Sequence, residues 1–184
     1  DIIELYSHEF VLEQPLNWPN INNLTLKSHE DANSKNVIIN AANSSYIITN
    51  NYNIILSIEK ITLTSANNII INKGNAAINI STCNISNIKA TTTFINGTIL
   101  NSNSDYCSIT VNNTVVNNCT AASGHSGLFY NNDKDLSINI NKSTLTNIKA
   151  YKNIIASTAT ANITNTIISN FNTNNFDDTE SGGC

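Results

Sequence analysis

The sequence predicts an all-β protein: a right-handed parallel β-helix, or solenoid, of roughly seven coils with an N-terminal cap region. Three observations predict this fold: an internal repeat, a period-two alternation of apolar residues within each copy, and a composition low in charge. The 184 residues are enough for a solenoid of several stacked units. Only 12% of them are charged, and abundant Ile and Val argue against a disordered chain.

Four segments that align without gaps carry the repeat. They begin at Ile78, Ile109, Ile138 and Ala161, which are 31, 29 and 23 residues apart. In each segment apolar or small residues occupy offsets 0, +2, +5, +7 and +10. The alternation is typical of strands with one buried face, and the change of phase between +2 and +5 requires a bend. A repeat of this length indicates a solenoid or a propeller.

A third apolar stretch follows each of the first three copies. These stretches are Thr93–Ile95, Gly127–Tyr130 and Asn153–Ala156. Three short strands per turn of the chain are the plan of a parallel β-helix. Propeller blades would need hairpin turns at regular spacing, whereas only one Asn-Gly pair, Asn96-Gly97, is present.

Weaker copies of the repeat precede the four strong ones. They are expected at Leu56–Leu63, Val37–Ile39 and Leu24–Leu26. Together with the strong copies they make roughly seven coils. At about 4.8 Å per coil, the solenoid would be a rod on the order of 35 Å long.

The N-terminal part of the chain differs in composition from the rest. Residues 1–35 hold eight of the 22 charged residues (9 Lys and 13 acidic) and the single Trp. Because the end coil of a solenoid must be covered, this part is predicted to be a cap or atypical first coils. A binding epitope centred on Trp18 is the alternative. Residues 36–176 are then the coils and residues 177–184 a polar C-terminal tail.

Offset +9 is Asn in all four strong copies: Asn87, Asn118, Asn147 and Asn170. The pattern predicts a structural Asn ladder, with side-chain amides hydrogen-bonded from coil to coil. It also suits a tight bend, since Asn tolerates the left-handed backbone conformation. The alternative is that a composition rich in Asn produces this column by chance.

One segment connects the repeat to a known family. Residues 117–130, with the sequence NNCTAASGHSGLFY, resemble the repeats of polymorphic outer-membrane-type proteins, which pair an FxxN-like turn with a GGA[I/L]Y-like strand. Those repeats belong to the pectin-lyase-like β-helix superfamily. Here the glycine motif is degenerate, and other copies replace it with Thr91–Phe94 and Tyr151–Ile154. The resemblance covers roughly residues 56–176 and implies a surface-exposed or secreted, adhesin-like stalk.

Because that superfamily includes polysaccharide lyases and hydrolases, an enzyme is the alternative function. A lyase would need a calcium site of several carboxylates and a strong cation, usually Arg, and this chain has no Arg. A hydrolase would need a carboxylate pair, for which the candidates are Asp133 with Asp135 and Asp177 with Asp178. Both pairs are better interpreted as solvated polar segments. No catalytic residues are predicted.

The remaining motifs predict neither a metal nor a cofactor. Gly124–Gly127 is one residue short of a nucleophile elbow, so His125 is only a minor candidate for a general base. His8 and His29 lack metal-ligand spacing. The four cysteines have no CxxC spacing, and their disulfide pairing stays open. Thr91–Thr93 and Thr158–Thr160 fall short of the regular Thr stack that binding to an ice or crystal surface would need.

Charge and localisation limit the partners. A net charge of −4 argues against nucleic acid as a partner. The sequence contains no stretch of 18 apolar residues, so no membrane-spanning helix is predicted. The chain begins at Asp1 and is expected to be mature or truncated, with an extracellular or cell-surface location. The expected partner is a protein or glycan at a cell surface, or a second copy joined end to end. N-glycosylation is expected to favour Asn84 and Asn96, with Asn23 and Asn43 as further candidates, and to spare Asn118.

Overall fold

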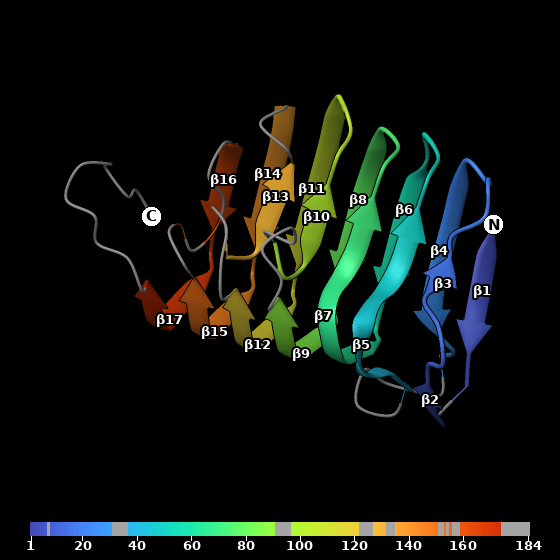
Figure 1. Ribbon diagram of the computed structural model, residues 1–184, viewed down its shortest axis with the longest axis horizontal. Helices are drawn as coiled ribbons and strands as arrows, with labels where there is room; N and C mark the ends of the chain where they lie inside the picture. Colours follow the sequence, from blue (N-terminus) through green and yellow to red (C-terminus); the bar gives the residue numbers. More distant parts are fainter. Residues whose placement is uncertain are drawn as a thin grey trace.

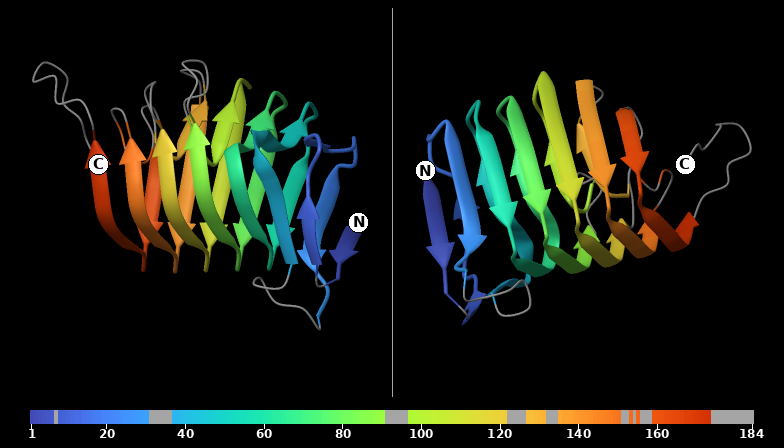
Figure 2. Two further views of the ribbon diagram at one scale, coloured as in Figure 1. Left: turned by 60° about the horizontal axis from the view of Figure 1, so that its bottom comes forward. Right: turned by 180° about the vertical axis from the view of Figure 1, so that it is seen from behind.

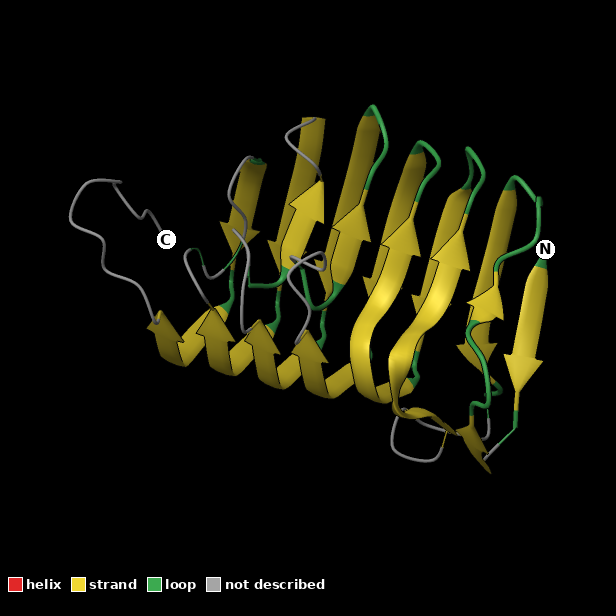
Figure 3. Cartoon of the chain, in the orientation of Figure 1, coloured by secondary structure: helices red, strands yellow, loops and turns green. Residues whose placement is uncertain are grey.

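The computed structural model describes residues 1–6, 8–30, 37–90, 97–121, 127–131, 135–150, 153, 155 and 159–173. The described residues form strands β1 to β17 and no helix (Figure 3). Every strand pair among them is parallel. The protein is therefore all-β, with parallel strands in stacked sheets and a solenoid-like course of the chain.

Seven strands form the first sheet, in the order β1–β4–β6–β8–β11–β14–β16. Each strand lies between the strands that precede and follow it in the stack, one circuit of the chain away (Figure 1). Their bounds are Ile2–Leu5 (β1), Asn23–Ser28 (β4), Ile55–Glu59 (β6), Ala76–Ser81 (β8), Tyr106–Asn112 (β11), Asp135–Asn141 (β14) and Thr160–Thr164 (β16).

The other ten strands form a second sheet that divides at β7. Strand β7 pairs with β9 through Thr62–Thr64 and with β10 through Ile70–Asn72. One branch continues through β9, β12, β15 and β17, and the other through β10 and β13, while β5 joins β2 and β3 to β7. The bounds are His8–Val11 (β2), Leu16–Asn17 (β3), Val37–Asn50 (β5), Thr62–Asn72 (β7), Asn84–Ala90 (β9), Leu100–Ser102 (β10), Val115–Ala121 (β12), Phe129–Asn131 (β13), Thr144–Ala150 (β15) and Ile167–Thr173 (β17).

From β4 onward, each strand of the first sheet is followed by a strand of the second, and the chain then returns to the first sheet beside its previous strand. The two views of Figure 2 show the resulting row of stacked rungs. Because successive strands lie 22 to 32 residues apart in sequence, nearly all contacts that hold the fold are non-local. Each rung therefore depends on its neighbours for burial.

The strand register confirms the ungapped alignment of the four strong copies. Offset 0 forms one column of Cα partners, from Ile78 through Ile109 and Ile138 to Ala161. Offset +7 forms a second column, from Ile85 through Val116 and Leu145 to Ile168. Matching offsets therefore lie directly beside one another in successive rungs, as the repeat predicts.

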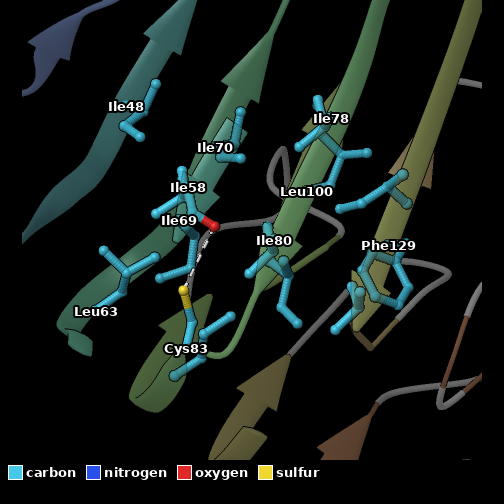
Figure 4. Packing of buried hydrophobic residues seen from close by; sticks show 14 of the residues in the cluster. Ile48, Ile58, Leu63, Ile69, Ile70, Ile78, Ile80, Cys83, Leu100 and Phe129 are labelled. Carbon is cyan, nitrogen blue, oxygen red and sulfur yellow. Dashed lines mark hydrogen bonds between the residues drawn. The ribbon is translucent and has the colours of Figure 1, made fainter. Parts of the chain in front are cut away.

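The core is a set of aliphatic columns enclosed between the sheets. In Figure 4, Ile78 and Ile80 of β8 lie among Ile58, Ile69, Ile70 and Leu100, and Phe129 lies beside them. All seven side chains are buried. The alternation of inward apolar and outward polar residues along β8, β11 and β14 follows from the period of two in a strand. Burial of these columns is the main favourable contribution to folding.

One detail of the predicted repeat is wrong. Val37–Ile39 and Leu24–Leu26 are not separate copies, because Leu24 pairs with Leu56 and Ile39 with Leu63, so both belong to one circuit. Because the connection between Leu24–Leu26 and Val37–Ile39 is longer than in the other copies, an ungapped alignment does not recognise them as parts of one copy. After β9 the described chain continues in β10, in which Leu100 pairs with Phe129, and the predicted stretch Thr93–Ile95 lies outside the described residues.

The N-terminal strands extend the same sheets. Strand β1 pairs with β4, and β2 pairs with β5, both in parallel. Trp18 follows β3, donates its backbone N–H to the carbonyl oxygen of Thr49 at 2.8 Å and is only 5% exposed. A buried indole cannot be the centre of a surface epitope, so that alternative is wrong.

Candidate functional site

The residues of the predicted Asn ladder occupy one exposed column on the second sheet. Asn87, Asn118, Asn147 and Asn170 have positive φ angles of 57°, 55°, 53° and 52°. Each falls at a position skipped by the regular pairing of β9, β12, β15 and β17. Asn is suited to this conformation because its short polar side chain tolerates the left-handed region.

Only part of this column is joined by direct amide hydrogen bonds. Asn118 Nδ2 donates to Asn87 Oδ1 at 2.7 Å, whereas Asn147 Nδ2 donates to Asn117 Oδ1 at 2.7 Å. Asn87 Nδ2 donates in turn to Thr64 Oγ1 at 3.4 Å. These bonds thus connect four rungs, from β15 through β12 and β9 to β7, through two adjacent columns rather than through one.

Replacing Asn147 tests the backbone requirement at this column. We expect Asn147→Gly to change the unfolding free energy little and Asn147→Val to lower it by about 2 kcal/mol, because a β-branched residue is strained at positive φ. Equilibrium urea unfolding followed by circular dichroism measures both. Lys149→Val, an exposed position on the same strand, is the control and should be neutral, because Val suits an ordinary strand position. Equal stability of the two Asn147 variants would contradict the expectation.

A second column of left-handed residues forms the bend between the two sheets. Its members stand at offset +4, where the repeat requires a change of phase: Lys60, Thr82, Asn113, Lys142 and Asn165. Backbone hydrogen bonds continue through the bend, for example from Asn113 N to Asn141 O at 3.0 Å. The bend therefore stacks as regularly as the strands do.

The residue after this bend forms a hydroxyl ladder. Thr114 Oγ1 donates to Asn112 O at 2.9 Å and accepts the N–H of Cys83, at offset +5 of the rung before it, at 3.3 Å. Ser143 Oγ repeats both bonds one rung later, to Asn141 O at 2.9 Å and from Thr114 N at 3.2 Å. Sequence reasoning classed offset +5 only as a small core position. The recurrence of hydroxyls there was the available signal.

The sequence pattern does not predict a buried network of amide and hydroxyl side chains that the structure shows. Asn50 Nδ2 donates to Asn72 Oδ1 at 2.7 Å, and Asn72 Nδ2 donates to Ser102 Oγ at 3.0 Å and to Gly74 O at 2.6 Å. In the next rung Asn131 Oδ1 accepts the N–H of Ser104 at 3.2 Å. All five side-chain-bearing members are buried. The network stands where the second sheet turns back to the first and satisfies the polar backbone of that turn.

Three cysteines are free and buried among the core columns: Cys83, Cys107 and Cys119. Burial raises the pKa of Cys83 and Cys119 to about 12 and that of Cys107 to about 11. A thiol whose pKa is raised in this way is protonated at neutral pH and is a poor nucleophile. These residues act as small hydrophobic side chains.

The thiols give a pH-dependent prediction. In a Cys184→Ser variant, we expect no reaction with an aromatic disulfide reagent at pH 8 in buffer and three reactive thiols in urea. The folded-state pKa of Cys83, about 12, lies above the ordinary value of 9.0, so its contribution to stability is complete below pH 9. That contribution is lost as pH rises from 9 toward 12. Rapid labelling of the folded chain would contradict the buried placement.

The carboxylate and histidine candidates are not assembled into a site by the described residues. Asp133, Asp177, Asp178 and His125 lie outside the described part of the chain. Asp135 is exposed at the start of β14. Within the described ranges no three His, Cys, Asp or Glu residues lie close enough together to hold a metal ion.

A small charged cluster lies at the N-terminal end. Glu4 Oε1 is 2.9 Å from Lys27 Nζ, and its Oε2 is 3.8 Å from His29 Nε2. The hydrogen bond from Lys27 lowers the pKa of Glu4. The ring of His29 stacks on Tyr6 with centroids 4.5 Å apart, and His8 meets Phe10 edge to face at 5.2 Å. The contacts of Glu4 and Tyr6 link the β1 segment to β4 and to His29 just after it, whereas the His8–Phe10 contact lies within β2, so these charges have a structural role.

The candidate glycosylation sites occupy different environments. Asn23 is exposed at the start of β4, and its carbonyl oxygen accepts the N-terminal ammonium of Asp1 at 2.8 Å. Asn84 is half-buried at the start of β9. Asn43 stands in β5, and Asn96 lies outside the described residues.

The comparisons with known proteins leave the chain without an assigned family. No protein-family model matches the sequence, no curated protein is significantly similar to it, and no solved structure matches it significantly. Among the residues that the structure describes there is no helix long and apolar enough to cross a membrane.

Proposed function

We propose that this chain is a non-catalytic segment of a right-handed parallel β-helix, of roughly seven coils with atypical first coils. We place it outside the cell or at the cell surface, where it serves as a structural stalk, an adhesin or a component of a surface assembly. The resemblance of residues 117–130 to polymorphic outer-membrane-type repeats supports this location.

The observation that carries the proposal is the use of polar side chains between rungs. Asn72 bonds to Asn50 and Ser102 inside the stack, and Thr114 and Ser143 link successive bends. These groups are saturated by contacts within the stack, so they maintain its regularity rather than meet a substrate. A row of rungs that are hydrogen-bonded to one another in this way is suited to form an elongated spacer with a long exposed surface.

Two measurements test this proposal. The purified chain, incubated with neutral and acidic polysaccharides, should release no new reducing ends. Cleavage that is lost in Asp133→Asn or Asp135→Asn would replace the proposal with a polysaccharide hydrolase or lyase. Immunogold labelling of unpermeabilised source cells should place the protein at the surface, and labelling confined to the cell interior would overturn the location.

A further inference from the structure

The outward face of β8, β11, β14 and β16 carries an ordered array of small neutral polar side chains. Six of them lie on the last three strands of the sheet, β11, β14 and β16, in two columns: Ser108, Ser137 and Thr160 in one column, Thr110, Asn139 and Asn162 in the other. Neighbouring rungs are about 4.8 Å apart, and the two columns about 6.6 Å apart. We call these six residues the hydroxyl–amide array.

The array has hydrogen-bonding capacity that the fold does not use. None of the six side chains makes a hydrogen bond to another described residue. The neighbouring column on the same face differs, since Asn141 Nδ2 donates to Asn112 Oδ1 at 3.2 Å and Thr164 Oγ1 donates to Asn141 Oδ1 at 3.1 Å. Hydroxyl and amide groups can both donate and accept. The array therefore offers donors and acceptors in two regular columns to a ligand in solution.

The charge and chemistry of this face select the ligand. No residue of the array is ionisable, and Asp135 is the only charged residue within β8, β11, β14 and β16, so this face carries little charge. It offers neither the cations that a phosphate or uronate chain requires nor the contiguous apolar surface that a lipid requires. A neutral ligand rich in hydroxyl groups is the complementary partner.

An exposed aromatic ring stands at the margin of the array. Tyr106 is 50% exposed and belongs to the same outward series on β11 as Ser108 and Thr110. The backbone N–H of Tyr106 donates a hydrogen bond to Asn75 Oδ1 at 3.2 Å. A phenol ring supplies an apolar face and a polar tip together, which suits the mixed surface of a sugar ring.

From these observations we infer that the hydroxyl–amide array binds a neutral, extended β-1,4-linked glycan that runs along the stack, across the strands. The length of one hexose in such a chain is close to the spacing of the rungs, so successive sugars meet successive pairs of side chains. Tyr106 supports the chain at one margin. The inference rests on the proposed function, for which it names the partner class and the binding face.

Isothermal titration of the 184-residue chain with cellohexaose and chitohexaose tests the inference, with hexagalacturonate as the acidic comparison. We expect at least one neutral hexasaccharide to bind and hexagalacturonate to show no binding. Thr110→Glu and Asn139→Glu should each weaken binding by about tenfold or more, because a carboxylate is then desolvated against the ligand. Tyr106→Ala should weaken it by about threefold or more.

The matched control is Thr120→Glu, the same change at a half-buried Thr of β12 on the other sheet. It should leave binding within about twofold of the wild type, with a similar urea midpoint for both Thr→Glu variants. Absence of binding to both neutral hexasaccharides, or unchanged binding by Thr110→Glu, overturns this inference and leaves the proposed function standing. A dimer that Thr110→Glu dissociates in sedimentation assigns the face to self-association and also overturns it. Cleavage of a hexasaccharide would overturn the proposed function instead.

Discussion

Replacing Asn72 with Leu should lower the free energy of unfolding by about 3 kcal/mol, since two buried polar groups lose their partners. The side chain is fully buried and joins three rungs. Without it, an Asn50 N–H loses its acceptor and the Gly74 carbonyl loses its donor. Leu has the same branched arrangement of side-chain heavy atoms as Asn, although it is larger, so the change removes the hydrogen bonds while keeping the outline of the side chain. Urea unfolding followed by circular dichroism is the measurement.

Asn139→Leu is the control for that substitution. Asn139 is exposed, and its side chain bonds to no other described residue, so we expect a change within about 0.5 kcal/mol. If Asn72→Leu is as stable as the wild type, apolar burial offsets the lost hydrogen bonds. The buried network would then not be a source of stability.

Truncating Phe129 to Ala should lower the free energy of unfolding by about 4 kcal/mol, through lost apolar burial and the cavity left behind. Among the described residues, Phe129 is the largest fully buried side chain, and it stands in the short strand β13. Its backbone N–H donates to Ile155 O at 2.9 Å, and it pairs with Leu100.

Phe171→Ala is the matched comparison, because the same side chain in β17 is 50% exposed. We expect it to cost about 1 kcal/mol or less. Urea titrations of both variants at one pH and temperature give the difference. Equal losses would mean that Phe129 is less enclosed than its burial indicates, or that β17 contributes more to the stack.

The sequence predicts the strands and their register because both follow from local pattern. Ile78, Ile109 and Ile138 head copies of equal internal spacing, so aligning them also aligns their rungs. The bend was predictable for the same reason, since residues such as Asn113 and Lys142 stand where the phase changes. Where the connections vary in length, the prediction failed, as at Leu24 and Val37.

The polar network was not predictable in this way. Asn50, Asn72 and Asn131 occur in a chain rich in Asn, and they precede the first-sheet strands at spacings that differ by one residue. No fixed offset marks them. Their burial is a consequence of the turn that carries them, and a turn is defined only once the strands on both sides have been placed. The burial of Trp18 depends in the same way on the neighbouring rung, through Thr49.

The sequence by itself determined the parallel rungs and their register over the four strong copies. It also indicated that four positions suit the left-handed backbone conformation: Asn87, Asn118, Asn147 and Asn170. These features depend on periodicity and on residue conformation, which are local properties. Only the tertiary structure decided which polar side chains are buried and bonded and which, like the hydroxyl–amide array, face solvent. That distinction requires partners 22 to 32 residues away, which a single strand cannot reveal.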